Sequence, residues 1–505
     1  MLTSITAFSG MVHAPHPFAA QAGLAVLRAG GNAVEAAVAV GAALSVACPN
    51  LSSLGGDGVW LVSEPGQYPL CIMAIGPAAQ GVNGGSGEVA DLPRQPGDGG
   101  PAALTVAGLV GGWAKALSLA ERWGRPLPLS DLFAEAMRLA KDGVPVSPSL
   151  AGDIARDWDR LNKDPGAAGL FGAGGEKTAV PVREGARLKQ AALARTFDWL
   201  SKAGLDDFYR GDLARSLVAS LERSGSILGL EDLERWHPTM GPALSIQTHR
   251  GVLAVAPPPT RSLAGLMTLG IWDQAWSYRQ REAARAVADP HTLLAQASNR
   301  ADQTCMAALG DPAAMSTSPE HILAVARLKE EAETLRTNSM EAPASDRGDL
   351  DRSVWFGVAD RTGRMVTVQQ GLNRAFGCAL VLSGTGVLWQ NRRDGFTSKD
   401  GANPLLPGRM PRSGLCPGFW HGADDYRMVL GVTGNRSEAM ARILTELFWF
   451  AEDPHSALST GSVFGAPSME PERADNLTGL LMVDPATNLL RGGLDPRSDA
   501  ACVGY

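Results

Sequence analysis

Ser353-Val354-Trp355-Phe356-Gly357-Val358-Ala359 is the stretch of this 505-residue chain that decides the fold. The segment before it, residues 337–352, reads TNSMEAPASDRGDLDR and carries six charged side chains, a composition typical of an exposed loop. After it, Asp360-Arg361-Thr362-Gly363 supplies a turn and residues 365–368 form a second apolar run. The pattern predicts a β-hairpin whose first strand begins at Ser353.

A serine at this junction has two interpretations: it either starts a strand and does nothing more, or it cleaves its own chain. In the second case the Ser353 hydroxyl attacks the carbonyl of Arg352, the acyl group shifts to oxygen, and water cleaves the ester. The new chain then begins with Ser353, and its free α-amine, with a pKa of about 7.7–8.0, is suited to act as the base. Nucleophile and base are both protein groups, so we expect no cofactor and no metal.

Short motifs spread over the whole chain point to one family. They are residues 11–64, with Gly30-Gly31-Asn32 and Ser52-Ser53-Leu54-Gly55-Gly56, then residues 139–146, residues 207–211, Pro257-Pro258-Pro259, Gly310-Asp311-Pro312 and Gly493-Leu494-Asp495-Pro496-Arg497. In this order they resemble the γ-glutamyltransferase (γ-glutamyl transpeptidase) family of N-terminal nucleophile hydrolases. The resemblance places Ser353 where the family has its nucleophile, usually threonine, and implies cleavage between Arg352 and Ser353.

The resemblance also implies the architecture, an α/β fold built as a four-layer αββα sandwich. Residues 1–352 become a mainly helical large segment with some sheet strands, and residues 353–505 a strand-rich small segment that carries the nucleophile. The two segments form one interlocked unit and a heterodimer after processing. The residue patterns agree, because they predict two helices within 17–48, strands within 55–75, a charged helix over 319–336 and a helix over 437–451.

An apolar strand ending in a small-residue turn, residues 429–435, is suited to stabilising an oxyanion. By resemblance Gly434 and Asn435 fall where the family has the Gly-Gly pair of its oxyanion hole; the alternative is an ordinary strand-end turn. Asn373 matches a family asparagine that faces the substrate. Ser413 matches the first of two adjacent binding-pocket serines, and Gly414 replaces the second; a surface-loop serine is the alternative for Ser413.

Several positions depart from the family. Gly371 stands in place of the hydroxyl residue that binds the nucleophile, so we expect that hydrogen bond to be missing. Gly395 replaces the aspartate that holds the donor's α-amino group, and residues 73–77 lack the arginine that holds its α-carboxylate. A charge without a partner is bound poorly in a closed pocket, so these differences argue against glutathione as the substrate.

The tracts Val354–Val358 and Val387–Arg392 instead look like the cytoplasmic branch of the family similar to oxamate amidohydrolase, whose members hydrolyse small amides. Arg392 then becomes a candidate for binding a substrate carboxylate in bidentate fashion. A solvated arginine, or one paired with Asp394, is the alternative.

Composition bounds the environment and the partners. The net charge of −7 argues against a nucleic-acid partner. Six cysteines without a CxxC pair indicate reduced thiols rather than disulfides or a zinc site. The N-terminus lacks a basic region and a long apolar core, and the apolar run 33–48 is short and interrupted by Glu35. We therefore predict a cytoplasmic protein with no membrane contact; association into a homo-oligomer is left open.

Three hypotheses remain. The first is an autoprocessed amidohydrolase that acts on a small amide through an acyl-enzyme on Ser353. The second is a γ-glutamyl hydrolase or transferase with an altered donor pocket. The third is an unprocessed, catalytically silent relative that acts as a binding protein.

Overall fold

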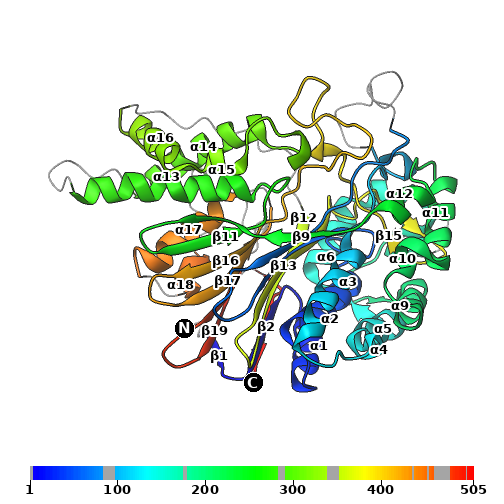
Figure 1. Ribbon diagram of the computed structural model, residues 1–505. Coiled ribbons are helices and arrows are strands. Elements are labelled where there is room, and N and C mark those ends of the chain that lie inside the picture. The colour runs from blue at the N-terminus through cyan, green and yellow to red at the C-terminus, as the bar shows by residue number, and fades with distance from the viewer. Residues whose placement is uncertain are drawn as a thin grey trace.

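Two seven-stranded antiparallel sheets form the centre of the molecule (Figure 1). The computed structural model describes residues 4–82, 97–174, 179–281, 290–337, 352–434, 437–451, 454–459, 478–495 and 498–505. Sheet I runs in the order β1 (Ile5–Ala7), β19 (Leu490–Leu494), β18 (Thr478–Val483), β17 (Arg427–Val432), β16 (Pro417–Gly422), β11 (Gly251–Val255), β10 (Leu244–Gln247). Sheet II runs in the order β20 (Ala501–Gly504), β2 (Gly10–Ala14), β12 (Arg352–Asp360), β13 (Met365–Asn373), β3 (Asp57–Ser63), β4 (Leu70–Ala74), β9 (Thr239–Pro242).

Helices cover the outer face of each sheet, so the layers follow the order αββα as predicted (Figure 1). Sheet II packs against α1 (Pro17–Arg28), α2 (Ala33–Ala47) and α3 (Leu109–Ala120). Sheet I packs against α13 (Ser262–Arg281) and α17 (Ser437–Phe448), and α14 (Pro290–Ala308) and α16 (Val325–Thr337) pack against α13 in the same apolar cluster. A third apolar cluster fills the space between the two sheets.

Further helices lie mainly in the middle of the large segment. They are α4 (Leu129–Leu132), α5 (Ala134–Asp142), α6 (Pro148–Arg156), α7 (Trp158–Leu161), α8 (Pro165–Phe171), α9 (Ala191–Ala203), α10 (Asp207–Arg210), α11 (Asp212–Arg223) and α12 (Leu230–Arg235), with α15 (Pro319–Ile322) and α18 (Pro454–Ser459) further along. Three two-stranded ribbons complete the fold: β5 (Val144–Pro145) with β8 (Arg187–Leu188), β6 (Gly172–Ala173) with β7 (Val180–Pro181), and β14 (Val381–Leu382) with β15 (Val387–Leu388).

Strand β12 shows how the sequence determines the layers. Successive side chains of a strand point to opposite faces. Val354, Phe356 and Val358 accordingly join the core beneath the helices, whereas Trp355 and Ala359 join the core between the sheets. Every residue of the strand after Arg352 is buried. A strand that is buried on both faces has an unbroken apolar sequence, whereas a strand buried on one face alternates apolar and polar residues. This explains the unbroken apolar run in the sequence.

Several local predictions are confirmed, but the single helix predicted over 319–336 is wrong, because α15 ends at Ile322 and α16 begins at Val325. The hairpin forms as β12 and β13, and α1 and α2 are separated at Gly30, which has a φ of 94° suited to a residue without Cβ. Asn32 and Glu35 form a capping box that starts α2. All six cysteines are free and buried, as expected. Among the described residues, no helix combines the length and apolar character needed to cross a membrane.

Candidate active site

The junction between Arg352 and Ser353 is the one irregular point of the β12–β13 pairing. Arg352 pairs with Asn373 and Ser353 pairs with Gly371, so the register shifts between the two junction residues. Ser353 is buried, with 3 % of its surface exposed. The Arg352 guanidinium donates to Asp153 Oδ2 on α6 at 2.6 Å. The candidate scissile bond is therefore held at an irregular site, of the kind often found beside catalytic residues.

The hydroxyl of Ser353 accepts a hydrogen bond from a side chain that the sequence gave no reason to select. Gln369 Nε2 donates to Ser353 Oγ at 2.8 Å and to the carbonyl oxygen of Val432 at 3.2 Å. Its Oε1 accepts from the backbone N–H of Cys416 at 2.8 Å. Gln369 thus joins Ser353 on sheet II to two parts of sheet I, the end of β17 and the residue just before β16 (Pro417–Gly422).

Steric crowding at Gly371 leaves no room for the hydroxyl side chain that the family has at this position. A Cβ built on Gly371 would lie 2.7 Å from the Cβ of Ser353 and 2.9 Å from the carbonyl oxygen of Arg352. No side chain fits at position 371 unless Ser353 moves. Gly371 has no side chain that could donate a hydrogen bond, but Ser353 Oγ still accepts one, from Gln369 two residues earlier.

A buried ion pair lies beside Ser353. Ser353, Gly371 and Asp57 are register partners on the neighbouring strands β12, β13 and β3. Arg392 Nε donates to Asp57 Oδ2 at 3.0 Å, and neither side chain is exposed. Burial raises the pKa of Asp57 to about 6, although Arg392 and the N–H groups of Gly76 and Gly108 oppose the shift.

The outer edge of the Arg392 guanidinium meets the residues that the resemblance selected. Nη1 lies 3.4 Å from Asn373 Oδ1 and 3.3 Å from Ser413 Oγ, and Nη2 lies 3.3 Å from the carbonyl oxygen of Gly371. Arg392 is 1 % exposed, so the solvated alternative is wrong. Ser413 is 2 % exposed, so it is not a surface-loop serine. Gly414, the next residue, is also buried.

Asn373 is held in an uncommon backbone conformation. Its φ is 72°, in the left-handed region that asparagine tolerates better than most residues. Its Nδ2 donates to the carbonyl oxygen of Asn391 at 2.9 Å and to Asp394 Oδ1. The conformation turns the end of β13 toward Arg392 and Asp394.

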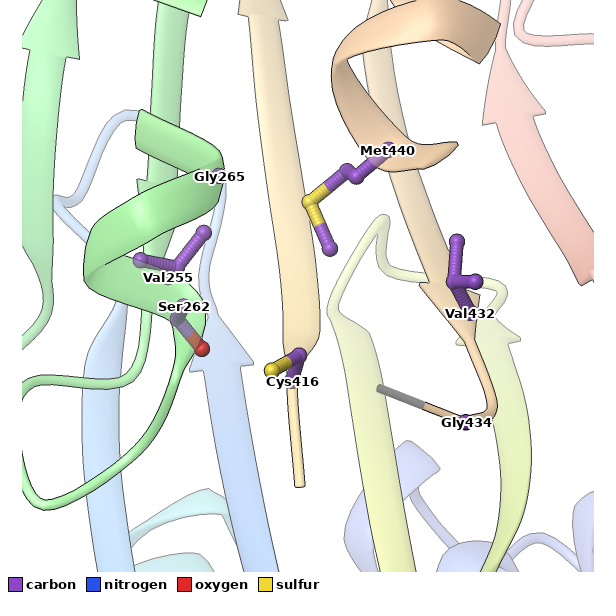
Figure 2. Close-up of a pocket in the computed structure, with 7 residues that line it drawn as sticks. All are labelled: Val255, Ser262, Gly265, Cys416, Val432, Gly434 and Met440. Carbon is purple, nitrogen blue, oxygen red and sulfur yellow. The ribbon is translucent and has the colours of Figure 1, made fainter. Parts of the chain in front are cut away.

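The end of β17 is one of the two parts of sheet I that the Gln369 side chain contacts. Gly434 follows the strand with a φ of 87°; Asn435 lies outside the described residues. Gly434 lines a small cavity together with Val255, Ser262, Gly265, Cys416, Val432 and Met440. Figure 2 shows Cys416 between Ser262, at the start of α13, and Gly434. The strand end, the cavity and Ser353 are therefore linked through one glutamine side chain.

Three important residues were missed from the sequence. Gln369 lies within an apolar strand pattern. The only signal in the sequence was a polar residue at a position that the pattern predicts to be buried. Asp57 follows the predicted Ser52–Gly56 turn, but its partner Arg392 is 335 residues away. Asp153 lies on an ordinary amphipathic helix, and nothing local shows that it binds Arg352.

Comparison with known proteins agrees with this geometry. The family model described as gamma-glutamyltranspeptidase matches residues 19–477. The oxamate amidohydrolase proenzyme of Klebsiella pneumoniae is 35 % identical to this chain, and the glutathione hydrolase-like YwrD proenzyme of Bacillus subtilis is 28 % identical. Each alignment covers 100 % of this chain and 100 % of the relative. The crystal structure of cephalosporin acylase from Bacillus halodurans matches with a TM-score of 0.85 and 25 % identity, over 100 % of this chain and 97 % of that one. The chain belongs to the gamma-glutamyltranspeptidase family of N-terminal nucleophile hydrolases and is an amide hydrolase made as a proenzyme.

Proposed function

We propose that the protein matures by cleaving its Arg352–Ser353 bond and then hydrolyses a small amide whose acyl part carries a carboxylate. The buried guanidinium of Arg392, next to the register partner of Ser353, is the observation that carries this proposal. The similarity to an oxamate amidohydrolase proenzyme supports it.

Maturation uses the groups around the junction. Ser353 Oγ attacks the carbonyl carbon of Arg352, the C–N bond breaks, and the acyl group moves to oxygen while the α-amine of Ser353 becomes free. Water then cleaves the ester and leaves a carboxylate on Arg352. The ion pair with Asp153 keeps the Arg352 side chain in place during these steps.

Turnover uses the same oxygen with the new amine as base. The amine accepts the proton of the Ser353 hydroxyl, Oγ bonds to the substrate carbonyl carbon, and the leaving amine departs with a proton. Water then releases the acid and restores the hydroxyl. The proposed oxyanion hole is the one that the resemblance implies, at Gly434 and Asn435, because preorganised backbone N–H groups stabilise the developing charge; of these two residues the structure describes Gly434, which follows β17.

The outer edge of Arg392 supports a carboxylate as the recognised group. Its contacts with Asn373, Ser413 and Gly371 are all to neutral oxygens at 3.3–3.4 Å. Charge-assisted bonds from guanidinium to carboxylate are shorter and stronger, so a carboxylate that displaces these contacts gains binding free energy. Asn373, Ser413 and Gly414 would then line the acyl pocket.

The two fragments, 1–352 and 353–505, remain together as a heterodimer in this proposal. Both sheets contain strands of both fragments: β1 and β11 flank the strands β19 to β16 in sheet I, and β2 and β3 flank β12 and β13 in sheet II, so each fragment supplies neighbours to the other. The cytoplasmic location stays a prediction that the six free buried thiols support.

Substrate panels can test the proposal directly. After intact-mass analysis shows both fragments, ammonia release is compared for oxamate and malonamate and for their neutral analogues oxamide and malonamide, and aniline release is measured for a γ-glutamyl anilide. We expect the two carboxylates to be preferred, and Arg392→Lys to raise KM for them more than for the neutral amides, since lysine cannot bind a carboxylate in bidentate fashion. Arg393→Lys, at a partly exposed neighbour, is the matched control.

Equal turnover of neutral and carboxylate amides, or an Arg392→Lys effect shared by both classes, would contradict the carboxylate assignment. Preference for the γ-glutamyl anilide would favour the γ-glutamyl hydrolase instead. An uncut, inactive protein would support the silent binding relative.

A further inference from the structure

Gln369 makes its hydrogen bonds with a fixed orientation. The backbone N–H of Cys416 can only donate, so the atom it contacts at 2.8 Å must be the acceptor Oε1. The two hydrogens of Nε2 are consequently directed at Ser353 Oγ, 2.8 Å away, and at the carbonyl oxygen of Val432, 3.2 Å away. The side chain is completely buried, so water does not compete for either bond.

The position of Gln369 is set by the shape of the strand. Residues two apart on a strand share a face, so Gln369 and Gly371 point to the same side of sheet II. Position 371 has no room for a Cβ beside Ser353. A long side chain at 369 can reach the hydroxyl from further along the strand without entering that space.

We propose that Gln369 is a catalytic residue that holds Ser353 Oγ and stabilises the negative charge that the oxygen gains as it loses its proton. The proposal rests on the proposed function, since it assigns the same oxygen to maturation and turnover. In turnover the hydroxyl proton passes to the free α-amine of Ser353, and in maturation it ends on the Ser353 nitrogen as that nitrogen leaves. In both reactions Oγ bonds to the carbonyl carbon and the C–N bond breaks. Gln369 keeps its own protons and contributes only the hydrogen bond.

The strength of this bond changes through the cycle. A hydrogen bond to an ionised oxygen is about twice as strong as one to a neutral oxygen. An ester oxygen, by contrast, is a poor acceptor. The bond from Gln369 therefore strengthens during attack, weakens in the acyl-enzyme, and strengthens again when water expels Oγ.

The adjacent residue gives a matched control for the first experiment. Gln370 is equally buried but faces the opposite side of sheet II, where its Nε2 donates to Ser52 Oγ at 2.7 Å and to the carbonyl oxygen of Gly41 at 3.0 Å. We expect Gln369→Met to slow self-cleavage and lower kcat by about 10- to 100-fold with KM unchanged. Gln370→Met should retain both rates, although it loses as many buried side-chain donor bonds.

A conservative variant separates chemistry from packing. Glu in Gln369→Glu has the same shape and can donate to Ser353 only when it is protonated. We expect its kcat to approach the wild-type value at low pH and to fall as the carboxyl group ionises. A pH profile parallel to that of the wild type would contradict a donor role.

The pKa of a thiol at position 353 can be measured without enzymatic activity, so it tests the role of Gln369 even in a variant that is never cut. In a Ser353→Cys protein, ultraviolet absorbance follows ionisation of the introduced thiol, and the Ser353→Ala protein supplies the background from the native thiols. A donor at 369 lowers this thiol pKa, so adding Gln369→Met should raise it, whereas adding Gln370→Met should not.

An unchanged thiol pKa, or a Gln369→Met protein that is cut and turns over at wild-type rates, would overturn the proposal. If the wild type is never cut although the thiol pKa responds, the proposed function fails, and Gln369 contacts an oxygen that does no chemistry. If the wild type is cut and active but Gln369→Met behaves like Gln370→Met, only the role of Gln369 fails.

Discussion

Ser353 and Gly371 face each other across β12 and β13 with no space for a side chain on the glycine. A Cβ on Gly371 would approach the Cβ of Ser353 to 2.7 Å and its Cα to 2.8 Å. Real Cβ atoms essentially never come that close to another atom, so the glycine determines where the nucleophile lies.

Introducing a hydroxyl side chain at position 371 should therefore reduce stability and slow self-cleavage. We expect Gly371→Ser to destabilise the protein by about 1–3 kcal/mol through overpacking and to slow self-cleavage, as followed by thermal denaturation and intact mass. Gly241→Ser on β9, where nothing lies within 4 Å of an added Cβ, is the control. Cleavage of Gly371→Ser at the wild-type rate or faster would show that the strand pair opens around Ser353.

The ion pair between Arg352 and Asp153 predicts an effect confined to maturation. Asp153→Asn keeps the shape but removes the charge that holds the Arg352 side chain at 2.6 Å. A loss of about 1.4 kcal/mol in holding the junction would slow cleavage about tenfold. Asp157→Asn, which disturbs the nearby pair with Arg160, should leave the cleavage rate unchanged; equal rates for the two variants would contradict the prediction.

The conformation of Gly434 predicts a sensitive position in turnover. Its φ of 87° lies in the left-handed region, where an L-residue costs about 1–2 kcal/mol. Gly434→Ala should lower kcat more than it raises KM, because the backbone N–H groups beside it would be misaimed. Gly66→Ala is a control with a similar conformation, a φ of 72° and open space around it. Equal kcat values for the two variants would rule out an oxyanion role for this turn.

Buried His13 predicts a loss of stability in acid. Its ring lies 4.9 Å from that of Trp355 between the sheets, and burial lowers its pKa from 6.5 to about 4. Because the folded-state pKa lies below the unfolded-state value, the stabilising contribution is complete above about pH 6.5 and is lost as the pH falls toward 4. The full contribution is about 3 kcal/mol.

Urea denaturation between pH 7 and pH 4.5 measures this contribution. The experiment is best done on the Ser353→Ala background, so that every sample is one uncut chain. His13→Gln should show a shallower decline in the free energy of unfolding with acid than its parent. Parallel declines would mean that other groups cause the acid sensitivity.

Local patterns of the sequence predicted much of the fold but little of how the site is held together. The hairpin and the α1–α2 pair follow from periodicity and capping within a few residues. The resemblance selected Asn373 and Ser413 as substrate-binding residues, and the structure brings both beside Arg392. The ion pair of Arg392 with Asp57, in contrast, spans 335 residues. No window of sequence contains both partners, so their meeting depends on the register of three strands.

Gln369 shows a different limit. Comparison with the family directed attention to position 371, where a hydroxyl group is absent, and correctly identified that absence. It could not show that a longer side chain two residues earlier reaches the same oxygen, since that contact depends on how β12 pairs with β13 and on the hydrogen bonds that orient the glutamine. The absence of an expected group is therefore weak evidence for a silent relative.

Strand β12 lies between β2, from the beginning of the chain, and β13, which follows the junction. Once the Arg352–Ser353 bond is cut, unfolding frees two separate polypeptides, and refolding becomes a second-order encounter that slows with dilution. The uncut precursor avoids this because its linker keeps the two parts at a high effective concentration. The lifetime of the cut enzyme should accordingly depend on slow unfolding rather than on reversible refolding. The cut form is the active one, but only the intact chain folds into it efficiently.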